Sequence, residues 1–420
     1  MFAYIDPGTG SMLFTMILGV ATAAFFAVRG LIAKFGVLLK GRGGKKAKDS
    51  ALDSSCSFVI FSDSKRYWNV FKPICDEFEK RNTSLVYLTM SEDDPALSES
   101  GYKYVKCRFI GNGNAAFAEL NHLRADICLS TTPGLDVYQW KRSKHVKKYV
   151  HITHDVCAIT AYRMFGVDYY DSILLPNAMM IDELREIEQK RKLPQKEVEI
   201  VGSVYVDGLM RQYDSYGGKE AKKDNTRTTV LVAPSWGASC LLNKYGSKFL
   251  NALKETGYNI IVRPHPQSFT SDPELMKNLQ DEFPVTDSFS WNRDNDNFAV
   301  MCRSDILISD FSGIIFDYSL TFGKPVIYAA AELDLAPYDD CWLEGEPWRL
   351  RVLPELGKQL DESDFSHLKE TIDAVLHSQE YNEKIEAVRE AALQHPGEAA
   401  TRTVDYLIDL QAKVTAQERI

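Results

Sequence analysis

The sequence lacks paired cysteines. Its eight cysteines are scattered singly along 420 residues, and no C-x-x-C pair or metal-type spacing occurs among them. Disulfide frameworks and structural zinc sites depend on such pairs, so the sequence argues against both. Several cysteines lie within apolar runs, as Cys128 does in residues 126–129, and there we expect small core residues.

An excess of basic residues is also missing. The formal net charge is −9, and no recognised nucleic-acid-binding module occurs, so nothing indicates a nucleic-acid partner. With 45% hydrophobic and 25% charged residues the composition is that of an ordinary globular protein. The length allows two or three domains with separate cores.

Charged residues are absent from residues 11–28, which are mostly apolar. This length is near the lower limit for a membrane-spanning helix. Basic residues follow the stretch and only Asp6 precedes it, so the remaining chain is predicted to be cytoplasmic. A cleaved signal peptide would have a basic segment first. We therefore predict a single-pass N-terminal anchor in the cell membrane, the alternative being a buried core helix.

From residue 57 onward, apolar runs typical of buried strands alternate with helical patterns. This order predicts an α/β fold with two doubly wound, Rossmann-like domains that face each other across a cleft. The predicted strands are 58–61, 85–88, 104–107, 127–130, 148–151, 172–175, 197–201, 229–233, 259–262, 306–308 and 326–328. The predicted helices are 69–80, 178–192, 247–256, 272–283, 297–303 and 314–322, with further helices from residue 365 onward.

Composition shifts suggest where these parts begin and end. A polar segment with two adjacent glycines reads as an interdomain linker. The predicted parts are a membrane anchor with a basic linker (1–50), an N-terminal α/β domain (51–212), the polar linker (213–227), a C-terminal α/β domain (228–380) and C-terminal helices (381–420).

Residues 306–328 form the most informative stretch. An apolar strand at 306–308 leads into Ser309-Asp-Phe-Ser-Gly313, and a helix and a second strand follow. Small polar residues at the start of a helix present backbone N–H groups and the positive end of the helix dipole to an anion. The pattern indicates a phosphate site formed by Ser309, Asp310, Ser312 and Gly313, although the same residues would also serve as ordinary helix caps.

Four polar loops follow predicted strands: 151–155, 234–237, 263–266 and 309–313. In doubly wound sheets, ligands bind at the carboxyl ends of the strands. Four such loops are hard to explain as caps alone. They predict an active cleft.

Arg263 and His265 flank a proline directly after a strand, in a loop that two prolines hold extended. A guanidinium beside an imidazole suits a diphosphate, because Arg supplies several donors and a permanent charge. His265 would donate a hydrogen bond to the leaving phosphate or protonate it. The alternative is a surface arginine and a structural histidine.

His154 and Asp155 lie at the end of the predicted strand 148–151 in the first domain, in the polar loop 151–155. His154 is a natural base for a hydroxyl nucleophile, and Asp155 could orient it, although neighbours on an extended strand point to opposite faces. His151 is the candidate structural partner. A buried, non-catalytic role is the alternative for either histidine.

The remaining candidates carry weaker signals. Ser235 is positioned to contact a phosphate, whereas Trp236 beside it is read as a packing residue. Asp317, one turn into the helix, would bind a ribose hydroxyl or simply favour the helix dipole. The acidic run 294–297 is interpreted as a solvated turn, and no metal site is predicted.

These loops together resemble the CDP-glycerol glycerophosphotransferase family, which includes teichoic acid polymerases and primases. The resemblance covers residues 149–328. Its most specific motifs are Val262-Arg-Pro-His-Pro266, Ile308-Ser-Asp-Phe-Ser-Gly-Ile-Ile-Phe-Asp-Tyr318 and Gly323-Lys-Pro325; residues 169–175, 201–207 and 233–236 are also similar.

The resemblance implies a glycosyltransferase-B-like fold and a phosphotransferase without a cofactor. Such an enzyme moves a polyol phosphate from CDP-glycerol or a similar donor to a hydroxyl of a lipid-linked or polymeric acceptor at the membrane, and releases CMP. By the same resemblance His154 and His265 are the two catalytic histidines. Arg263, Ser309, Asp310 and Ser312 match the donor-phosphate region.

The chain departs from the family pattern at two places. Thr153-His-Asp-Val156 stands where the family often has Trp-His-Gly-Thr, and Gly237 stands where it often has a basic residue. Both positions touch the acceptor or donor pocket, which leaves the polyol and the acceptor open. The alternatives are a nucleotide-sugar glycosyltransferase of cell-envelope polysaccharide synthesis, or an inactive membrane-tethered scaffold.

Overall fold

The computed structural model describes residues 56–417 apart from 157–158, 219–226, 295 and 330–332. The predicted anchor and basic linker at 1–50 therefore lie outside the described residues. Within the described part, no helix is both long and apolar enough to cross a membrane.

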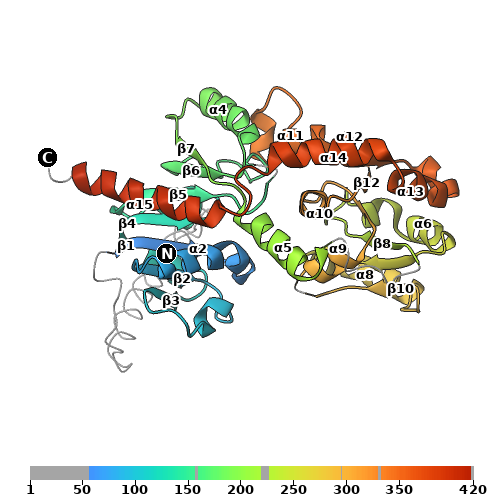
Figure 1. Ribbon diagram of the computed structural model, residues 1–420, viewed down its shortest axis with the longest axis horizontal. Coiled ribbons are helices and arrows are strands. Elements are labelled where there is room, and N and C mark those ends of the chain that lie inside the picture. The colour runs from blue at the N-terminus through green and yellow to red at the C-terminus, as the bar shows by residue number, and fades with distance from the viewer. Residues whose placement is uncertain (1–55, 157–158, 219–226, 295, 330–332, 418–420) are drawn as a thin grey trace, which may run out of the picture. The chain divides into compact units, whose positions relative to one another are not determined.

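The first sheet has seven parallel strands in the order β3-β2-β1-β4-β5-β6-β7 (Figure 1). Three of them, β1, β2 and β6, contain no charged residue, which suits strands covered on both faces. The chain order reverses between β1 and β4, and ligand sites form at such a switch point. The strands are β1 (Cys56–Ser62), β2 (Leu85–Thr89), β3 (Val105–Phe109), β4 (Arg124–Ser130), β5 (His145–Ile152), β6 (Ser172–Leu175) and β7 (Glu197–Ile200).

The second sheet repeats this plan with six parallel strands in the order β10-β9-β8-β11-β12-β13. Its switch point lies between β8 and β11, whose register pairs Ile308 with Val232. The strands are β8 (Thr229–Val232), β9 (Asn259–Val262), β10 (Phe289–Trp291), β11 (Ile306–Ser309), β12 (Val326–Ala329) and β13 (Gly357–Leu360). Short β10 and β13 at the two edges were not predicted.

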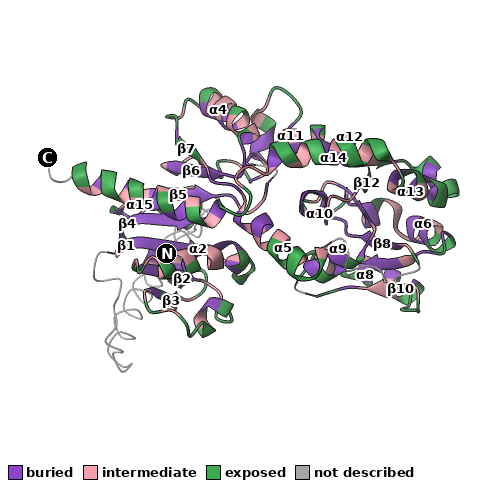
Figure 2. Ribbon diagram, viewed as in Figure 1, coloured by how far each residue is buried: buried purple, intermediate pink, exposed green. Residues whose placement is uncertain are grey.

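Buried side chains concentrate on the strands and on the helix faces that cover them (Figure 2). Cys128 is fully buried in β4, as predicted for a core cysteine. Helix α10 (Ile314–Phe322) has the predicted bounds and ends at Gly323, whose φ of 63° is readily adopted by glycine. The other predicted helices are α2 (Trp68–Lys80), α4 (Met179–Arg191), α6 (Leu241–Glu255), α8 (Pro273–Glu282) and α9 (Phe298–Arg303).

Helix α5 (Val204–Ser215) leads from the first sheet toward the second. It includes residues 213–215, so the predicted linker begins inside a helix; residues 219–226 of that linker lie outside the described residues. The apolar face of α5 packs against α2 and α10, which explains why this part is ordered despite its polar composition.

The C-terminal region is helical, as predicted, with α13 (Leu368–Leu376), α14 (Gln379–Ala392) and α15 (Ala399–Gln417). Helix α14 packs against α10, whereas α15 returns to the first sheet and packs against α2 and β4 (Figure 1). Asn177 joins these parts, because its side-chain amide donates to the carbonyls of Val156 and Ala392, each at 3.2 Å.

A segment after β12 also reaches the first sheet. The backbone N–H of Asp339 donates to the Tyr162 carbonyl and that of Asp340 to the Thr160 carbonyl, each at 2.9 Å. The Asp339 carboxylate accepts from the N–H groups of Phe165 and Gly166 at 2.8 and 3.0 Å. These bonds hold the segment that carries Tyr162, which lies beside His154.

Candidate functional site

The carboxyl edge of the first sheet places the side chains of Thr131 and Tyr67 beside His154. Thr131 follows β4, and its hydroxyl lies 3.1 Å from Nδ1 of His154. The ring of Tyr67 lies 4.9 Å from the His154 ring, centroid to centroid. His154 remains partly exposed, with 29% of its side chain accessible. It is therefore held from one side and open on another, as a base that receives a proton must be.

Asp155 contributes less to His154 than the sequence suggested. Its Oδ2 lies 3.9 Å from Nε2 of His154, which is too far for a hydrogen bond. The distance allows an electrostatic attraction only when the ring is protonated. The partner at hydrogen-bond distance is Thr131, which the sequence motifs did not single out.

His151 has a structural environment. It is fully buried in β5, and its Nε2 lies 3.1 Å from the hydroxyl of Tyr162. Burial, with a smaller effect of nearby His154, lowers the pKa of His151 to about 3. His151 is therefore neutral near pH 7 and packs between the rings of Tyr162 and Tyr170.

Asp63 and Arg66, in the loop after β1, are further candidates that were not predicted. Burial raises the pKa of Asp63, while Thr132, His154 and Arg66 act in the opposite direction. Arg66 is exposed, and its charge also lowers the pKa of His265, which follows β9 of the second sheet. The sequence contained a signal for this loop, because the polar segment Ser62-Asp-Ser64 directly follows the predicted strand 58–61, as the other polar loops follow theirs.

In the second half, Arg263 follows β9 and is largely buried. Its guanidinium donates to the Asn292 side-chain carbonyl and, at 2.7 Å, to the backbone carbonyl of Asp294. The segment 294–297, predicted as a solvated turn, therefore helps to fix the position of the Arg263 guanidinium through the Asp294 carbonyl. A guanidinium carries five N–H donors, so this arrangement leaves donors for a ligand.

His265 has a defined neutral form. Its Nδ1 accepts a hydrogen bond from the backbone N–H of Gln267 at 3.1 Å, which leaves the proton on Nε2. Burial and the nearby charge of Arg66 lower the pKa of His265. These three influences all disfavour the imidazolium. The structure thus favours a neutral hydrogen-bond donor at Nε2 over a group that protonates the leaving phosphate.

Trp236 is not the packing residue that was predicted. Its side chain is 44% exposed, and its ring lies 6.3 Å from that of His265 at an interplanar angle of 31°. The loop after β8 directs the indole toward solvent because Ser235, not Trp236, is buried beside Asp310. An exposed aromatic face beside His265 is available to a ligand.

Ser309 and Asp310 have partners inside the protein. Ser309 is fully buried and donates its hydroxyl to the Ala233 carbonyl at 2.7 Å. The Asp310 carboxylate accepts from the backbone N–H groups of Ser235, Leu241 and Phe311 at 2.9, 3.0 and 2.8 Å. Burial raises the pKa of Asp310, and these bonds counteract it. Both side chains therefore shape the loop, and the prediction that they touch a phosphate stays a prediction without geometric support.

The residues best placed for an anion are Ser312 and Gly313. Gly313 is the N-cap of α10, and no side chain caps this helix end. A methyl group added at Gly313 would meet nothing within 4 Å, so the space above it is open. Ser235 lies beside Asp310, to which its backbone N–H donates. The Ser235 hydroxyl lowers the pKa of Asp310 but forms no hydrogen bond of good geometry. The anion site stays a prediction, and the open space at Gly313 is what supports it.

Asp317 lies one turn into α10. Enclosure by the surrounding chain, with a smaller contribution from the charge of Asp155, raises its pKa to about 7, although part of its surface still reaches solvent. The charge of Asp317 raises the pKa of Tyr205 on α5, and the charge of Arg263 lowers it. That Asp317 binds a ribose hydroxyl stays a prediction.

Charge effects reach from the loops of the first sheet to those of the second: Asp155 helps to raise the pKa of Asp317, and Arg66 helps to lower the pKa of His265. Asp155 and Arg66 therefore lie within electrostatic range of Asp317 and His265. The chemistry that these residues together would suit is attack of a hydroxyl on a bound phosphate.

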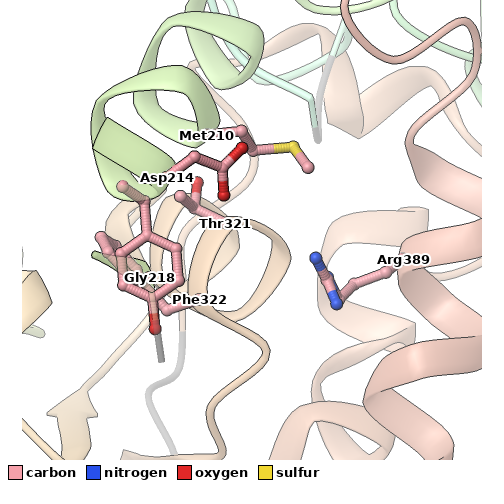
Figure 3. A pocket seen from close by; sticks show the side chains of 7 residues that line it. Met210, Asp214, Gly218, Thr321, Phe322 and Arg389 are labelled. Atoms are coloured by element: carbon pink, nitrogen blue, oxygen red, sulfur yellow. The ribbon is translucent and has the colours of Figure 1, made fainter. Parts of the chain in front are cut away.

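A small cavity lies away from these residues, between α5, the end of α10 and α14 (Figure 3). Its volume is about 190 Å³. It is lined by Met210, Tyr213, Asp214, Gly218, Thr321, Phe322 and Arg389, none of which was predicted as a site residue. In the described ranges, no group of three or more His, Cys, Asp or Glu side chains is arranged to hold a metal ion.

Residues 214–408 match the family model described as CDP-Glycerol:Poly(glycerophosphate) glycerophosphotransferase. The match covers slightly less than half of the chain. The match confirms the family recognised from the loop motifs, and it contains Arg263, His265 and the whole of α10. No curated protein matches the chain significantly in sequence.

Solved structures share the fold. The Wall Teichoic Acid Polymerase TagF is similar with a TM-score of 0.56 and 18% identity, over 85% of this chain and 90% of that one. UDP-GlcNAc 2-epimerases from Neisseria meningitidis and Methanocaldococcus jannaschii give TM-scores of 0.52 and 0.53 at 15% and 12% identity, each over 85% of this chain and 100% of the other. These likenesses confirm the predicted two-sheet, glycosyltransferase-B-like architecture; at such identities they show the fold alone.

Proposed function

We propose that this protein transfers glycerol phosphate, or a related polyol phosphate, from a CDP-linked donor to a hydroxyl of a membrane-bound cell-envelope acceptor. The observation that carries the proposal is the family match of residues 214–408, the part that holds the donor-side residues. The pairing of a partly exposed His154 with a phosphate-type site in the second half supports it.

In this reaction the acceptor oxygen attacks the phosphorus that bears the polyol. A new P–O bond forms, the bond to the bridging oxygen breaks, and CMP leaves. His154 takes the proton of the acceptor hydroxyl. No cofactor and no metal are proposed, so the charge on the donor must be met by protein groups.

Three donor-side features would meet that charge. Arg263 supplies a fixed cation, His265 a neutral Nε2–H donor, and the N-terminus of α10 at Ser312 and Gly313 the positive end of a helix dipole. Prepositioned donors of this kind stabilise charge in the transition state without reorganisation.

The proposal is tested by incubating the full-length protein with CDP-glycerol, CDP-ribitol, UDP-sugars and GDP-sugars. Release of CMP with transfer of the polyol phosphate supports it. Release of UDP or GDP instead would establish the alternative glycosyltransferase, and nucleotide binding without turnover would establish the scaffold. A thermal-shift screen with the same ligands identifies binding independently, because a ligand of the folded state stabilises it by mass action.

The position of the donor phosphate is tested by Gly313→Ala. Gly313 has an ordinary helical φ of −57°, and the added methyl group would meet no protein atom within 4 Å. We expect unchanged stability and a KM for the CDP-linked donor raised about tenfold, since the methyl group occupies the ligand's space. An unchanged KM would place the diphosphate elsewhere. Gly345→Ala, also in open space but in another loop, is the matched control.

A further inference from the structure

Two side chains at the carboxyl ends of β1 and β4 surround the proposed base. Thr131 lies 3.1 Å from Nδ1 of His154. Asp63 lies in the loop after β1, as does Tyr67, whose ring is 4.9 Å from that of His154, and the charge of His154 lowers the pKa of Asp63. Neither residue belongs to the motifs that resemble the family.

Thr131 is a rigid partner for the ring. It is fully buried, and it follows Ser130, whose hydroxyl donates to the Phe61 carbonyl at 2.8 Å. Strand β4 pairs with β5, and this pairing places Ser130 opposite His151. The chain reaches His154 directly after β5. The distance between the Thr131 hydroxyl and the ring is thus set by the sheet itself.

Asp63 is an incompletely solvated carboxylate. Its Oδ1 is buried and forms no hydrogen bond of good geometry within the described residues. The Thr132 hydroxyl lies near enough to lower the pKa of Asp63, but it too lacks a well-formed bond. A carboxylate in such surroundings is stabilised by a positive charge nearby, and it stabilises that charge in return.

We propose that Thr131 fixes the ring of His154 and that Asp63 stabilises the imidazolium that arises when Nε2 takes the proton of the acceptor hydroxyl. Nδ1 keeps its own proton throughout and donates it to the Thr131 oxygen. Both are positioning residues, because neither touches the reacting atoms. The catalytic consequence rests on the proposed function; the effect on the basicity of His154 does not.

Other groups also face the ring and enter any pH dependence. Asp155 lies 3.9 Å from Nε2, and its carboxylate acts in the same sense as Asp63. Neutral His151 and the phenols contribute little charge at pH 7, and Arg66 acts through Asp63. The groups are Asp63 and Tyr67 from the loop after β1, His151 from β5, and Asp155 and Tyr162 from the segment that follows.

The first test is a titration of His154 in the full chain by NMR with isotope-labelled histidine, its signal assigned by its loss in His154→Gln. Asp63→Asn keeps the shape and removes the charge, so we expect the pKa of His154 to fall by about one unit. Asp93→Asn is the control, since Asp93 is exposed and pairs with Lys65. An unchanged pKa in Asp63→Asn overturns the role of Asp63.

The same spectra test Thr131. Nitrogen shifts report which ring nitrogen carries the proton, and the proposal requires the neutral ring to be protonated at Nδ1. Thr131→Val should move the proton toward Nε2, whereas Thr131→Ser, which keeps the hydroxyl, should not. A wild-type ring protonated at Nε2 would overturn the proposal, because Nε2 could not then accept a proton.

Kinetics complete the test. With CMP release from CDP-glycerol as the assay, we expect kcat to fall about tenfold in Asp63→Asn and Thr131→Val, with the donor KM unchanged and Thr131→Ser near wild type. In Asp63→Asn the acid limb of the pH–kcat profile should move to lower pH. If the wild type releases no CMP, the proposed function fails, while the titration still decides the role of Asp63.

Discussion

The two sheets have the same strand arrangement at their switch points, and each has a serine at the end of the strand there. They differ in the residue that follows this serine. Ser130 at the end of β4 donates to the Phe61 carbonyl at 2.8 Å, and Ser309 at the end of β11 donates to the Ala233 carbonyl at 2.7 Å. The next residue is Thr131 in the first sheet and Asp310 in the second. Thr131 holds a titratable ring, whereas Asp310 accepts backbone N–H groups.

This difference separates two tasks. The edge of the first sheet gathers titratable side chains, among them Asp63 and His154, whose ring lies beside Thr131. The edge of the second sheet gathers fixed donors, because Asp310 organises the loop after β8 and the N-terminus of α6 beside the open start of α10. Proton handling and anion handling are thus assigned to different halves of one repeated architecture.

The largest effect that tests this division is expected at His265. If it is a neutral donor, His265→Ala should lower kcat about 100- to 1000-fold, as loss of a transition-state donor does. His265→Gln should recover part of that loss, because its amide N–H can replace Nε2–H. Initial rates of CMP release measure both. Equal loss in the two variants would instead indicate proton transfer, and the division of tasks would fail.

The next largest effect is expected at Asp310, whose carboxylate accepts three backbone hydrogen bonds. Asp310→Ala leaves three buried N–H groups without their acceptor, so we expect the free energy of unfolding to fall by about 3 kcal/mol in urea titrations. Asp310→Asn retains one acceptor oxygen and should lose less. A loss below about 1 kcal/mol in the alanine variant would mean that the loop is held by other contacts.

A smaller, pH-dependent effect is expected at Asp317. Its pKa rises from 3.8 to about 7 on folding, so the folded state binds the extra proton and its stability falls as pH rises through that window. Asp317→Asn removes this cost. We expect the variant to exceed wild type by about 1–2 kcal/mol at pH 8 and to match it near pH 4. A difference independent of pH would show that the carboxyl is not perturbed.

The Asp155→Asn variant refines that measurement. It removes the like charge that helps to raise the pKa of Asp317, so the pH window of Asp317 should move to lower pH. This shift would also demonstrate, in solution, that the two halves approach each other at these residues.

The smallest effect tests the shared part of the plan. Ser130→Ala and Ser309→Ala each remove one buried hydrogen bond between neighbouring strand ends. We expect each to cost about 1 kcal/mol of unfolding free energy, and the two costs to be similar. A marked inequality would show that the two switch points are equivalent in topology but not in energetics.

Local patterns predicted most of the fold. The bounds of α10 and β6 were predicted to the residue, because each is a short apolar run closed by polar or glycine residues. The loop motifs also indicated the family and the two histidines. Domain boundaries and the N-terminal anchor stay predictions. Edge strands β10 and β13 were missed because they are short and carry little apolar pattern.

Side-chain roles within the loops were predicted less well. Ser309 and Asp310 were expected to face a phosphate, yet their partners lie on a loop about 75 residues earlier in the chain. Trp236 was expected to pack and is exposed. Thr131 and Asp63 lie outside the motifs that resemble the family, and the only sequence signal for Asp63 was its place in a polar segment after a predicted strand.

The sequence by itself determined the α/β class, the polar loops at the strand ends and the family, because these depend on patterns within a few consecutive residues. The tertiary structure decided which loop residue meets a ligand and which meets the protein. A serine or carboxylate in a turn has the same local signature in both cases. Its partner is chosen by the neighbouring strand, which pairing brings close from far along the chain.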